Sequence, residues 1–197
     1  METIHIDFNK RYTFADYLTW LDDKRRELIN GFVSIMTPAP SRIHQRISGD
    51  LYGHFWRYLQ NHECEVYSAP FDVRFPSKTF EIADDKIYTV LQPDICIICD
   101  KSKLDDRGCI GAPDLIVEIL SFSTVKKDVD DKFKLYEANG VREYWIVQPN
   151  DETITTFLLE NGKYLIQGIF TRGSKVKIGI FDGKISIDLD YVFKSNQ

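Results

Sequence analysis

Two acidic residues open or interrupt segments that are otherwise apolar enough to form the centre of a β-sheet. Asp94 opens the apolar run 95–98, and Glu118 lies inside the run 115–120. A carboxylate buried in such a place is costly unless a base pairs with it or a cation binds it. On adjacent strands, the two acids would offer the oxygen ligands that Mg²⁺ or Mn²⁺ prefers. The plainer alternatives are a salt bridge to a buried base for Glu118 and an ordinary strand-end acid for Asp94.

A lysine follows on the helix that the sequence predicts next. Residues 125–139 carry apolar side chains at helical spacing, and Lys132 falls within their apolar arc, whereas Lys134 projects to the opposite side. Asp128 lies one turn before Lys132, near the same face. A core-facing lysine either extends its ammonium to solvent or meets an anion. In the second case the ammonium of Lys132 would point at the two carboxylates and at a substrate phosphate.

A second Pro-Asp pair, Pro113-Asp114, competes with Pro93-Asp94 for the metal-binding role. Asp114 and Glu118 share a face of one predicted strand but stand four residues apart, about 13 Å. That separation is too large for one ion, whereas Asp94 can face Glu118 from the neighbouring strand. We therefore predict that Asp94 is the partner of Glu118.

Four cysteines raise the question of a zinc or redox site. Cys96 and Cys99 have CxxC spacing, but residues three apart on a β-strand point to opposite faces. No second CxxC or Cys/His pair follows in the sequence. We therefore interpret the cysteines (Cys64, Cys96, Cys99 and Cys109) as buried free thiols.

The rest of the sequence predicts the elements that must position these residues. Helices are expected at 13–22, 41–60 and 125–139, strands at 65–75, 94–99, 114–120 and 143–147, and loops at 76–85 and 101–111, the second basic and mobile. The pairs Asn30-Gly31, Asn161-Gly162 and Asp182-Gly183 are typical of hairpin turns. A chain of 197 residues suffices for one hydrophobic core and is short for two domains. We predict a single α+β domain over residues 1–197.

The composition is that of an ordinary soluble protein, with 43% hydrophobic and 28% charged residues. No apolar run approaches the roughly 20 residues that span a bilayer, and residues 1–10 lack the layout of a signal peptide. We therefore expect a cytoplasmic protein with no membrane partner. The formal net charge of −5 argues weakly against tight nucleic-acid binding, which usually needs a basic surface. Local basic groups such as Lys24-Arg-Arg26 still allow weaker binding.

Several segments, taken in order, resemble the PD-(D/E)xK nuclease superfamily and most of all its Uma-type branch of restriction-endonuclease-like proteins. They are Glu27-Leu-Ile-Asn-Gly31, His44-Gln45, Ala69-Pro-Phe-Asp-Val-Arg74, Pro93-Asp94, Gly111-Ala-Pro-Asp-Leu-Ile-Val-Glu118, Asp128-x-x-x-Lys132 and Gly140-Val-Arg-Glu-Tyr-Trp-Ile-Val147. The likeness spans about residues 12–149 and leaves 150–193 as a C-terminal β-hairpin extension. It implies a restriction-endonuclease-like core, in which helices flank a central mixed β-sheet, with added antiparallel hairpins.

The resemblance also implies a role for each site residue. Asp94 and Glu118 would bind Mg²⁺, with Mn²⁺ as the alternative. Glu27 would complete or support the acidic cluster, and Lys132 would be the catalytic lysine.

One position departs from the superfamily pattern, which places the lysine two residues after the acid. That position is Leu120 here, so Lys132 would have to reach the site from the following helix. His44 and Asp128 are candidate accessory residues, although a lone histidine beside the apolar stripe of a helix is more often structural.

The function that these residues favour is a metal-dependent endonuclease that hydrolyses phosphodiester bonds in DNA. Cutting both strands of a duplex usually requires two active sites, which favours a homodimer. Two alternatives remain: a phosphoesterase that acts on RNA or nucleotides, and a catalytically inactive module with the same fold, which Leu120 would favour.

Overall fold

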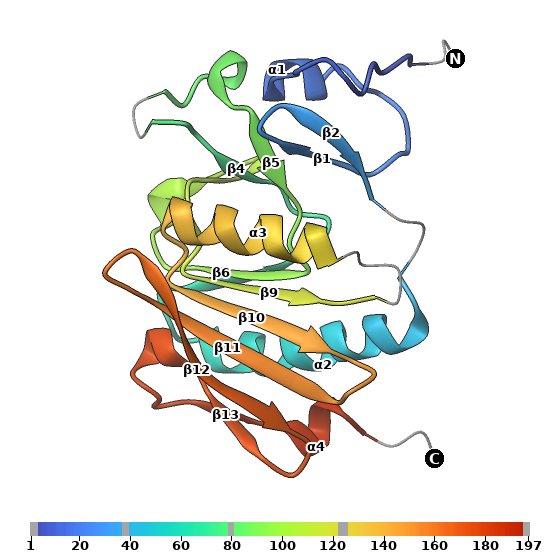
Figure 1. Cartoon of the computed structure of the whole chain (residues 1–197). Coiled ribbons are helices and arrows are strands. Elements are labelled where there is room, and N and C mark those ends of the chain that lie inside the picture. The colour runs from blue at the N-terminus through green and yellow to red at the C-terminus, as the bar shows by residue number, and fades with distance from the viewer. Residues whose placement is uncertain (1–3, 37–39, 79–80, 122–125, 195–197) are drawn as a thin grey trace.

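Two six-stranded β-sheets make up most of the molecule (Figure 1). The computed structural model describes residues 4–36, 40–78, 81–121 and 126–194, with the backbone alone for 126–128. In spatial order, the first sheet contains β2 (Phe32–Ile35), β1 (Arg26–Ile29), β5 (Thr89–Leu91), β4 (Val73–Phe75), β8 (Gly108–Ile110) and β7 (Leu104–Asp105). The second contains β12 (Lys163–Thr171), β11 (Thr153–Glu160), β10 (Glu143–Gln148), β9 (Leu115–Ile119), β6 (Ile95–Ile98) and β3 (Glu65–Ser68).

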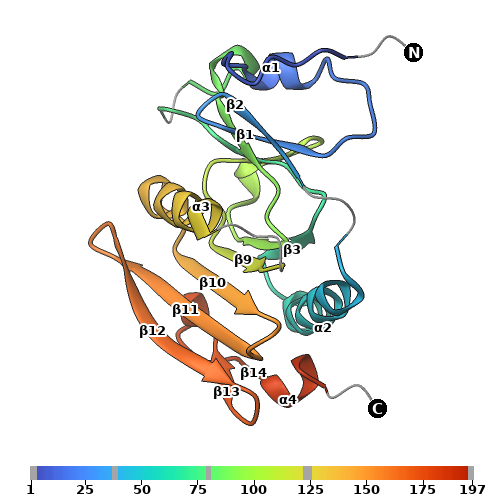
Figure 2. The ribbon, with the colours of Figure 1, turned by 45° about the vertical axis from the view of Figure 1, so that its right-hand side comes forward.

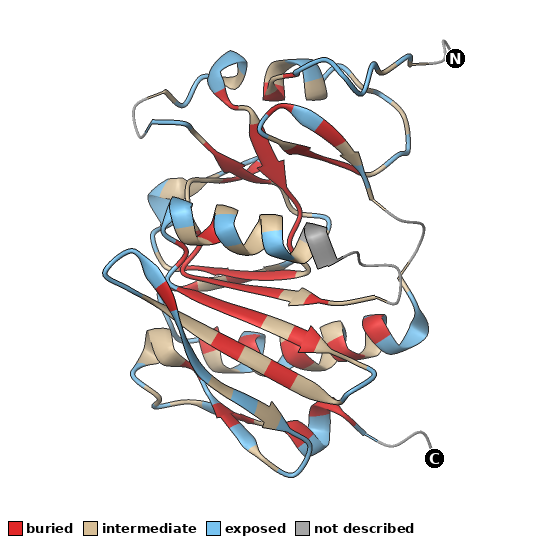
Figure 3. Cartoon of the chain, viewed as in Figure 1, coloured by how far each residue is buried: buried red, intermediate tan, exposed pale blue. Residues whose placement is uncertain are grey.

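The second sheet is mixed, because β9 and β10 run parallel while its other neighbouring strands are antiparallel. Its central strands are almost wholly buried (Figure 3), which explains their continuous apolar sequence. The helices are α1 (Phe14–Tyr17), α2 (Arg42–Leu59), α3 (Lys126–Asn139) and α4 (Leu189–Val192). Short 3₁₀ turns occupy Asp84–Lys86, Lys101–Lys103 and Gly179–Phe181. None of the helices in the described ranges is long and apolar enough to cross a bilayer.

The two longer helices cover opposite faces of the second sheet (Figure 2). The apolar stripe of α2, which includes Leu51 and Phe55, packs on the face that carries Ile95 and Val117. On the other face, Ile116 packs in one cluster with residues of α3 and of the first sheet. Since side chains alternate along a strand, an acid next to Val117 belongs to this second face, where α3 and the first sheet meet it.

Local signals account for most of the element ends. Ser41 caps α2 by accepting a hydrogen bond from the His44 amide, and Thr13 and Asp16 form a capping box at α1. Asn30 and Gly31 both have positive φ, 53° and 88°, as the turn between β1 and β2 requires. The hairpin at Asn161-Gly162 joins β11 and β12 as predicted.

Four expectations about elements need correction. The strand expected at 65–75 is two strands, β3 and β4, which belong to different sheets. The loop expected at 101–111 contains β7 and β8, which extend the first sheet. The helix that begins at Phe14 ends at Tyr17 instead of about residue 22. The hairpin expected at Asp182-Gly183 is present, but the strands that it joins, β13 (Lys175–Lys177) and β14 (Ser186–Asp188), form a separate two-stranded sheet instead of extending the central one.

The cysteine interpretation is correct for two of the four residues. Cys96 and Cys109 are buried free thiols, but Cys64 and Cys99 form a disulfide. Glu65 pairs with Ile98 in the antiparallel ladder of β3 and β6, so Cys64 and Cys99 follow directly as the next opposed residues. The strand pairing that brings them together is not visible in the spacing of either cysteine.

Candidate active site

Three charged side chains from three different elements meet between the two sheets. The Lys132 ammonium, on α3, donates hydrogen bonds to Glu27 Oε1 at 2.9 Å and to Glu118 Oε1 at 3.0 Å. Glu27 lies on β1 of the first sheet, and Glu118 lies on β9 of the second. All three side chains are largely buried: 15% of the Lys132 side chain is exposed, 6% of Glu27 and 12% of Glu118. The lysine therefore meets anions and does not extend to solvent.

Neighbouring groups hold both glutamates in place. The Gln92 amide donates to Glu27 Oε1 at 2.9 Å, and the Tyr136 hydroxyl donates to Glu118 Oε1 at 2.7 Å. Tyr136 stands one helical turn after Lys132, so both residues reach the same carboxylate from one face of α3. Neither Gln92 nor Tyr136 was anticipated as a site residue. The four-residue spacing on α3 could have identified Tyr136, whereas Gln92 acts through its backbone and leaves no sequence signal.

Asp94 completes the group of acids from the start of β6. The β6–β9 ladder pairs Ile95 with Val117, so one further step places Asp94 opposite Glu118. The carboxylate Oδ2 of Asp94 accepts a hydrogen bond from the Ile119 amide at 2.7 Å, and His44 Nε2 lies 3.3 Å from the same oxygen. The predicted pair of acids thus comes from neighbouring strands, and His44 reaches it from the first turn of α2.

Burial and charge shift the ionisation of the cluster. Burial raises the pKa of Glu118 to about 7, and the nearby Asp94 and Glu27 carboxylates add to the rise, although Lys132 opposes it. Burial disfavours the charged form of Lys132, but Glu118 and Glu27 outweigh it and hold the pKa of the lysine well above its usual value. Although burial disfavours the charged form of His44, its hydrogen bond to Asp94 raises the pKa of the imidazole. Burial and the neighbouring acids therefore disfavour the ionised form of Glu118, whereas the two glutamates favour the charged form of Lys132.

The donor set suits a hard divalent cation. Asp94 and Glu118 each keep one carboxylate oxygen, Oδ1 and Oε2, that accepts no hydrogen bond from the residues that the structure describes. Oxygen ligands are those that Mg²⁺ prefers, and it is commonly bound by one or two carboxylates together with waters and substrate phosphates. No group of three or more His, Cys, Asp and Glu side chains within the described ranges could hold a metal ion. Asp94 and Glu118 would offer two carboxylates, and substrate and water would have to complete the coordination.

The other candidate residues fall outside the cluster or outside what the structure describes. Asp114 lies at the opposite end of β9, where it pairs with Arg142 at 2.9 Å and accepts the Cys99 amide. Asp114 therefore lies apart from the cluster and already has partners of its own. The side chain of Asp128 lies outside the described residues. Lys134 is exposed, as the helical phase predicts.

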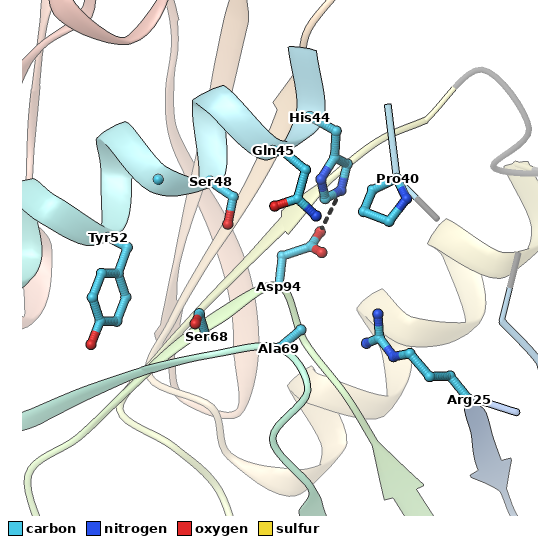
Figure 4. A pocket seen from close by; sticks show the side chains of 10 residues that line it. Arg25, Pro40, His44, Gln45, Ser48, Tyr52, Ser68, Ala69 and Asp94 are labelled. Atoms are coloured by element: carbon cyan, nitrogen blue, oxygen red, sulfur yellow. Dashed lines mark ion pairs between the residues drawn. The ribbon is translucent and has the colours of Figure 1, made fainter. Parts of the chain in front are cut away.

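A cleft of about 180 Å³ opens beside the cluster. Asp94 and His44 line it, together with the outer face of α2 and the end of β3. Figure 4 shows Asp94 near the middle, with Tyr52 and Arg25 on opposite sides of it. The acid that would bind the metal is thus open to a ligand from solvent.

Comparisons with known proteins agree with this architecture. A family model described as Uma2, "Putative restriction endonuclease", matches residues 14–190. An uncharacterized protein of Synechocystis sp. is 28% identical over 155 residues, which cover 77% of this chain and 76% of that protein. The crystal structure of a putative nuclease belonging to DUF820 from Anabaena variabilis has a TM-score of 0.71 at 17% identity and covers 92% of this chain and 97% of that one. The structural likeness confirms the expected α+β fold with its central mixed sheet.

Proposed function

Because the chain belongs to the Uma2 family of restriction-endonuclease-like proteins, we propose that it is a metal-dependent endonuclease that hydrolyses phosphodiester bonds in DNA. The family match reaches beyond the expected limit of residue 149 and includes most of the C-terminal hairpins. The observation that carries the proposal is the meeting of Glu27, Asp94, Glu118 and Lys132 beside an open cleft. In sequence these residues are spread over more than a hundred positions.

Asp94 and Glu118 would hold the metal through the carboxylate oxygens that accept no hydrogen bond from the described residues. A bound Mg²⁺ supplies Lewis acidity toward a phosphate and makes a bound water easier to deprotonate. Glu27 contributes indirectly, because its carboxylate holds the Lys132 ammonium in place.

Lys132 would act on the phosphate itself. An ammonium has three donors, and Lys132 uses two of them on Glu27 and Glu118. The third, which no described residue occupies, would be left for a phosphate oxygen or the attacking water. The two glutamates fix the direction of the lysine, so little reorganisation is needed when charge develops on the phosphate.

The decisive experiment is cleavage of supercoiled plasmid DNA with Mg²⁺ and with EDTA. We expect the parent protein to nick or linearise the plasmid with Mg²⁺ alone, and Asp94→Asn and Glu118→Gln to lose this activity. Each substitution keeps the shape of the side chain and removes its charge. The exposed acids Asp151 and Glu160 provide matched controls as Asp151→Asn and Glu160→Gln, which should cut at the parent rate.

Two outcomes would contradict the proposal. Equal cleavage by the Asp94→Asn and parent proteins would show that the assigned site is wrong. A folded parent protein that cuts neither DNA nor RNA with Mg²⁺ or Mn²⁺ would indicate the inactive module. Light scattering on the same preparation tests the homodimer that a two-strand cut favours.

A further inference from the structure

The cleft beside Asp94 has two features that the catalytic cluster does not explain. One is a basic side chain, Arg25, that is held in place by a buried polar network. The other is an uncharged polar face of α2 at whose centre a glycine stands. We propose that this cleft is the binding site for one strand of the nucleic acid, which runs from Arg25 past Asp94 to Tyr52 (Figure 4). This inference rests on the proposed function for the identity of the ligand.

Arg25 is anchored at one end of the cleft. Its Nε and Nη2 donate to Gln92 Oε1 at 3.0 and 2.9 Å. The side-chain nitrogen of Gln92, Nε2, in turn donates to Asp72 at 2.8 Å and to the Tyr17 hydroxyl at 3.3 Å. Burial raises the pKa of Asp72, and Gln92 itself is only 7% exposed. Both hydrogen bonds that hold the guanidinium go to the uncharged Gln92, while the Asp72 carboxylate attracts Arg25 without a hydrogen bond to it.

The remaining donors of Arg25 make no hydrogen bond within the part of the chain that the structure describes. A planar guanidinium with free donors suits a phosphate, which it can bind through two oxygens. Gln92 also joins this arginine to the catalytic cluster, since its backbone amide binds Glu27. A phosphate at Arg25 would therefore have a defined position relative to the reacting one at Asp94.

Beyond His44, the face of α2 that lines the cleft is polar but uncharged. Gln45, Ser48, Gly49 and Tyr52 follow at intervals of three and four residues, so they share one side of the helix. Ser68, at the end of β3, faces them across the cleft. An amide and two hydroxyls can bind the edge of a nucleobase, and an aromatic ring can stack on its face. Apart from Asp94, the described residues that line the cleft include no acid, which suits the approach of a polyanion.

Gly49 leaves the space that the strand would occupy. Apart from the adjoining backbone of α2, no atom lies within 4 Å of the position that a Cβ would take at Gly49, and the same holds for Gly53, one turn further along α2. Glycine lowers the stability of a helix interior by roughly 1 kcal/mol relative to alanine, so a side chain at either position should not harm the fold. Of these two glycines, Gly49 lines the cleft and Gly53 does not.

Because Gly49 lines the cleft and Gly53 does not, a large side chain at each position gives a steric test of the inference. Binding of labelled single-stranded DNA, single-stranded RNA and duplex DNA would be measured by fluorescence anisotropy in EDTA, where no metal-dependent cleavage occurs. We expect Gly49→Phe to weaken binding at least tenfold and Gly53→Phe to change it less than twofold. Thermal unfolding of both variants checks that each is folded. The three probes identify the form of nucleic acid that the cleft accepts.

A second experiment tests the contribution of charge to binding. Arg25→Met should weaken binding and reduce the slope of log K against log salt by about one, as loss of one phosphate contact does. Lys134→Met removes an exposed charge on α3 that does not line the cleft and should leave the slope nearly unchanged. Equal binding by the Gly49→Phe and parent proteins, equal losses at the two glycines, or no binding of any probe would overturn the inference. Binding that depends on Arg25 and Gly49 in a protein that cuts nothing would refute only the proposed catalysis.

Discussion

Glu118→Gln should stabilise the metal-free protein at neutral and alkaline pH. The pKa of Glu118 rises from 4.5 to about 7 in the folded protein because the carboxyl is buried near two other acids. The folded state therefore binds this proton more tightly than the unfolded chain. The contribution of Glu118 to stability consequently falls as the pH rises from about 4.5 to about 7, and the loss is complete above that range.

The magnitude follows from the two pKa values. At about 1.4 kcal/mol for each pH unit, the difference between 4.5 and about 7 corresponds to about 3 kcal/mol. Glutamine resembles the neutral carboxyl: its oxygen can still accept from Lys132 and Tyr136, and Lys132 keeps its pair with Glu27. We expect the variant to gain on the order of 3 kcal/mol over the parent protein between pH 4.5 and pH 8.

Urea unfolding of both proteins in EDTA, at intervals from pH 4.5 to pH 8, measures this difference directly. Adding Mg²⁺ at pH 8 should then stabilise the parent protein more than the variant, because a bound ligand raises the free energy of unfolding and the variant lacks one carboxylate. A stability difference that does not change with pH, or a variant that is less stable at pH 8, would refute the electrostatic account of the site.

Two further predictions test the roles of particular side chains. Lys132→Met should lower the cleavage rate on the order of a hundredfold or more, the scale of losing one preorganised electrostatic group, whereas Lys134→Met, on the exposed side of α3, should leave the rate nearly unchanged. Plasmid cleavage time courses compare the two, and equal losses would indicate general attraction of DNA. Glu143→Gln should destabilise the protein by about 1–3 kcal/mol, the opposite sign to Glu118→Gln. The Glu143 carboxylate accepts hydrogen bonds from the Trp145 indole and from two backbone amides, so a glutamine –NH₂ would face a donor. Urea unfolding at pH 8 measures this, and an unchanged midpoint would contradict it.

Local sequence was enough to predict the elements that carry the site. The turn at Asn30-Gly31 depends on residues next to each other in the sequence, because steric limits on φ act locally. The same applies to helix phase, which placed Lys132 on the buried side of α3 and Lys134 on the exposed side. The apolar runs around Asp94 and Glu118 predicted central strands, since only a sheet centre buries both faces of a strand.

Only the tertiary structure decided which distant residues meet. The pairing of Cys64 with Cys99, the separation of 65–75 into strands of two sheets, and the contact of Lys132 with Glu27 all depend on strand order. Strand order is a property of the whole chain, because each strand can form its backbone hydrogen bonds with many partners. The network that holds Arg25 has the same origin, since Gln92 lies 67 positions from that arginine. Sequence periodicity shows which face of an element is buried, but the identity of the groups that face it follows only from packing.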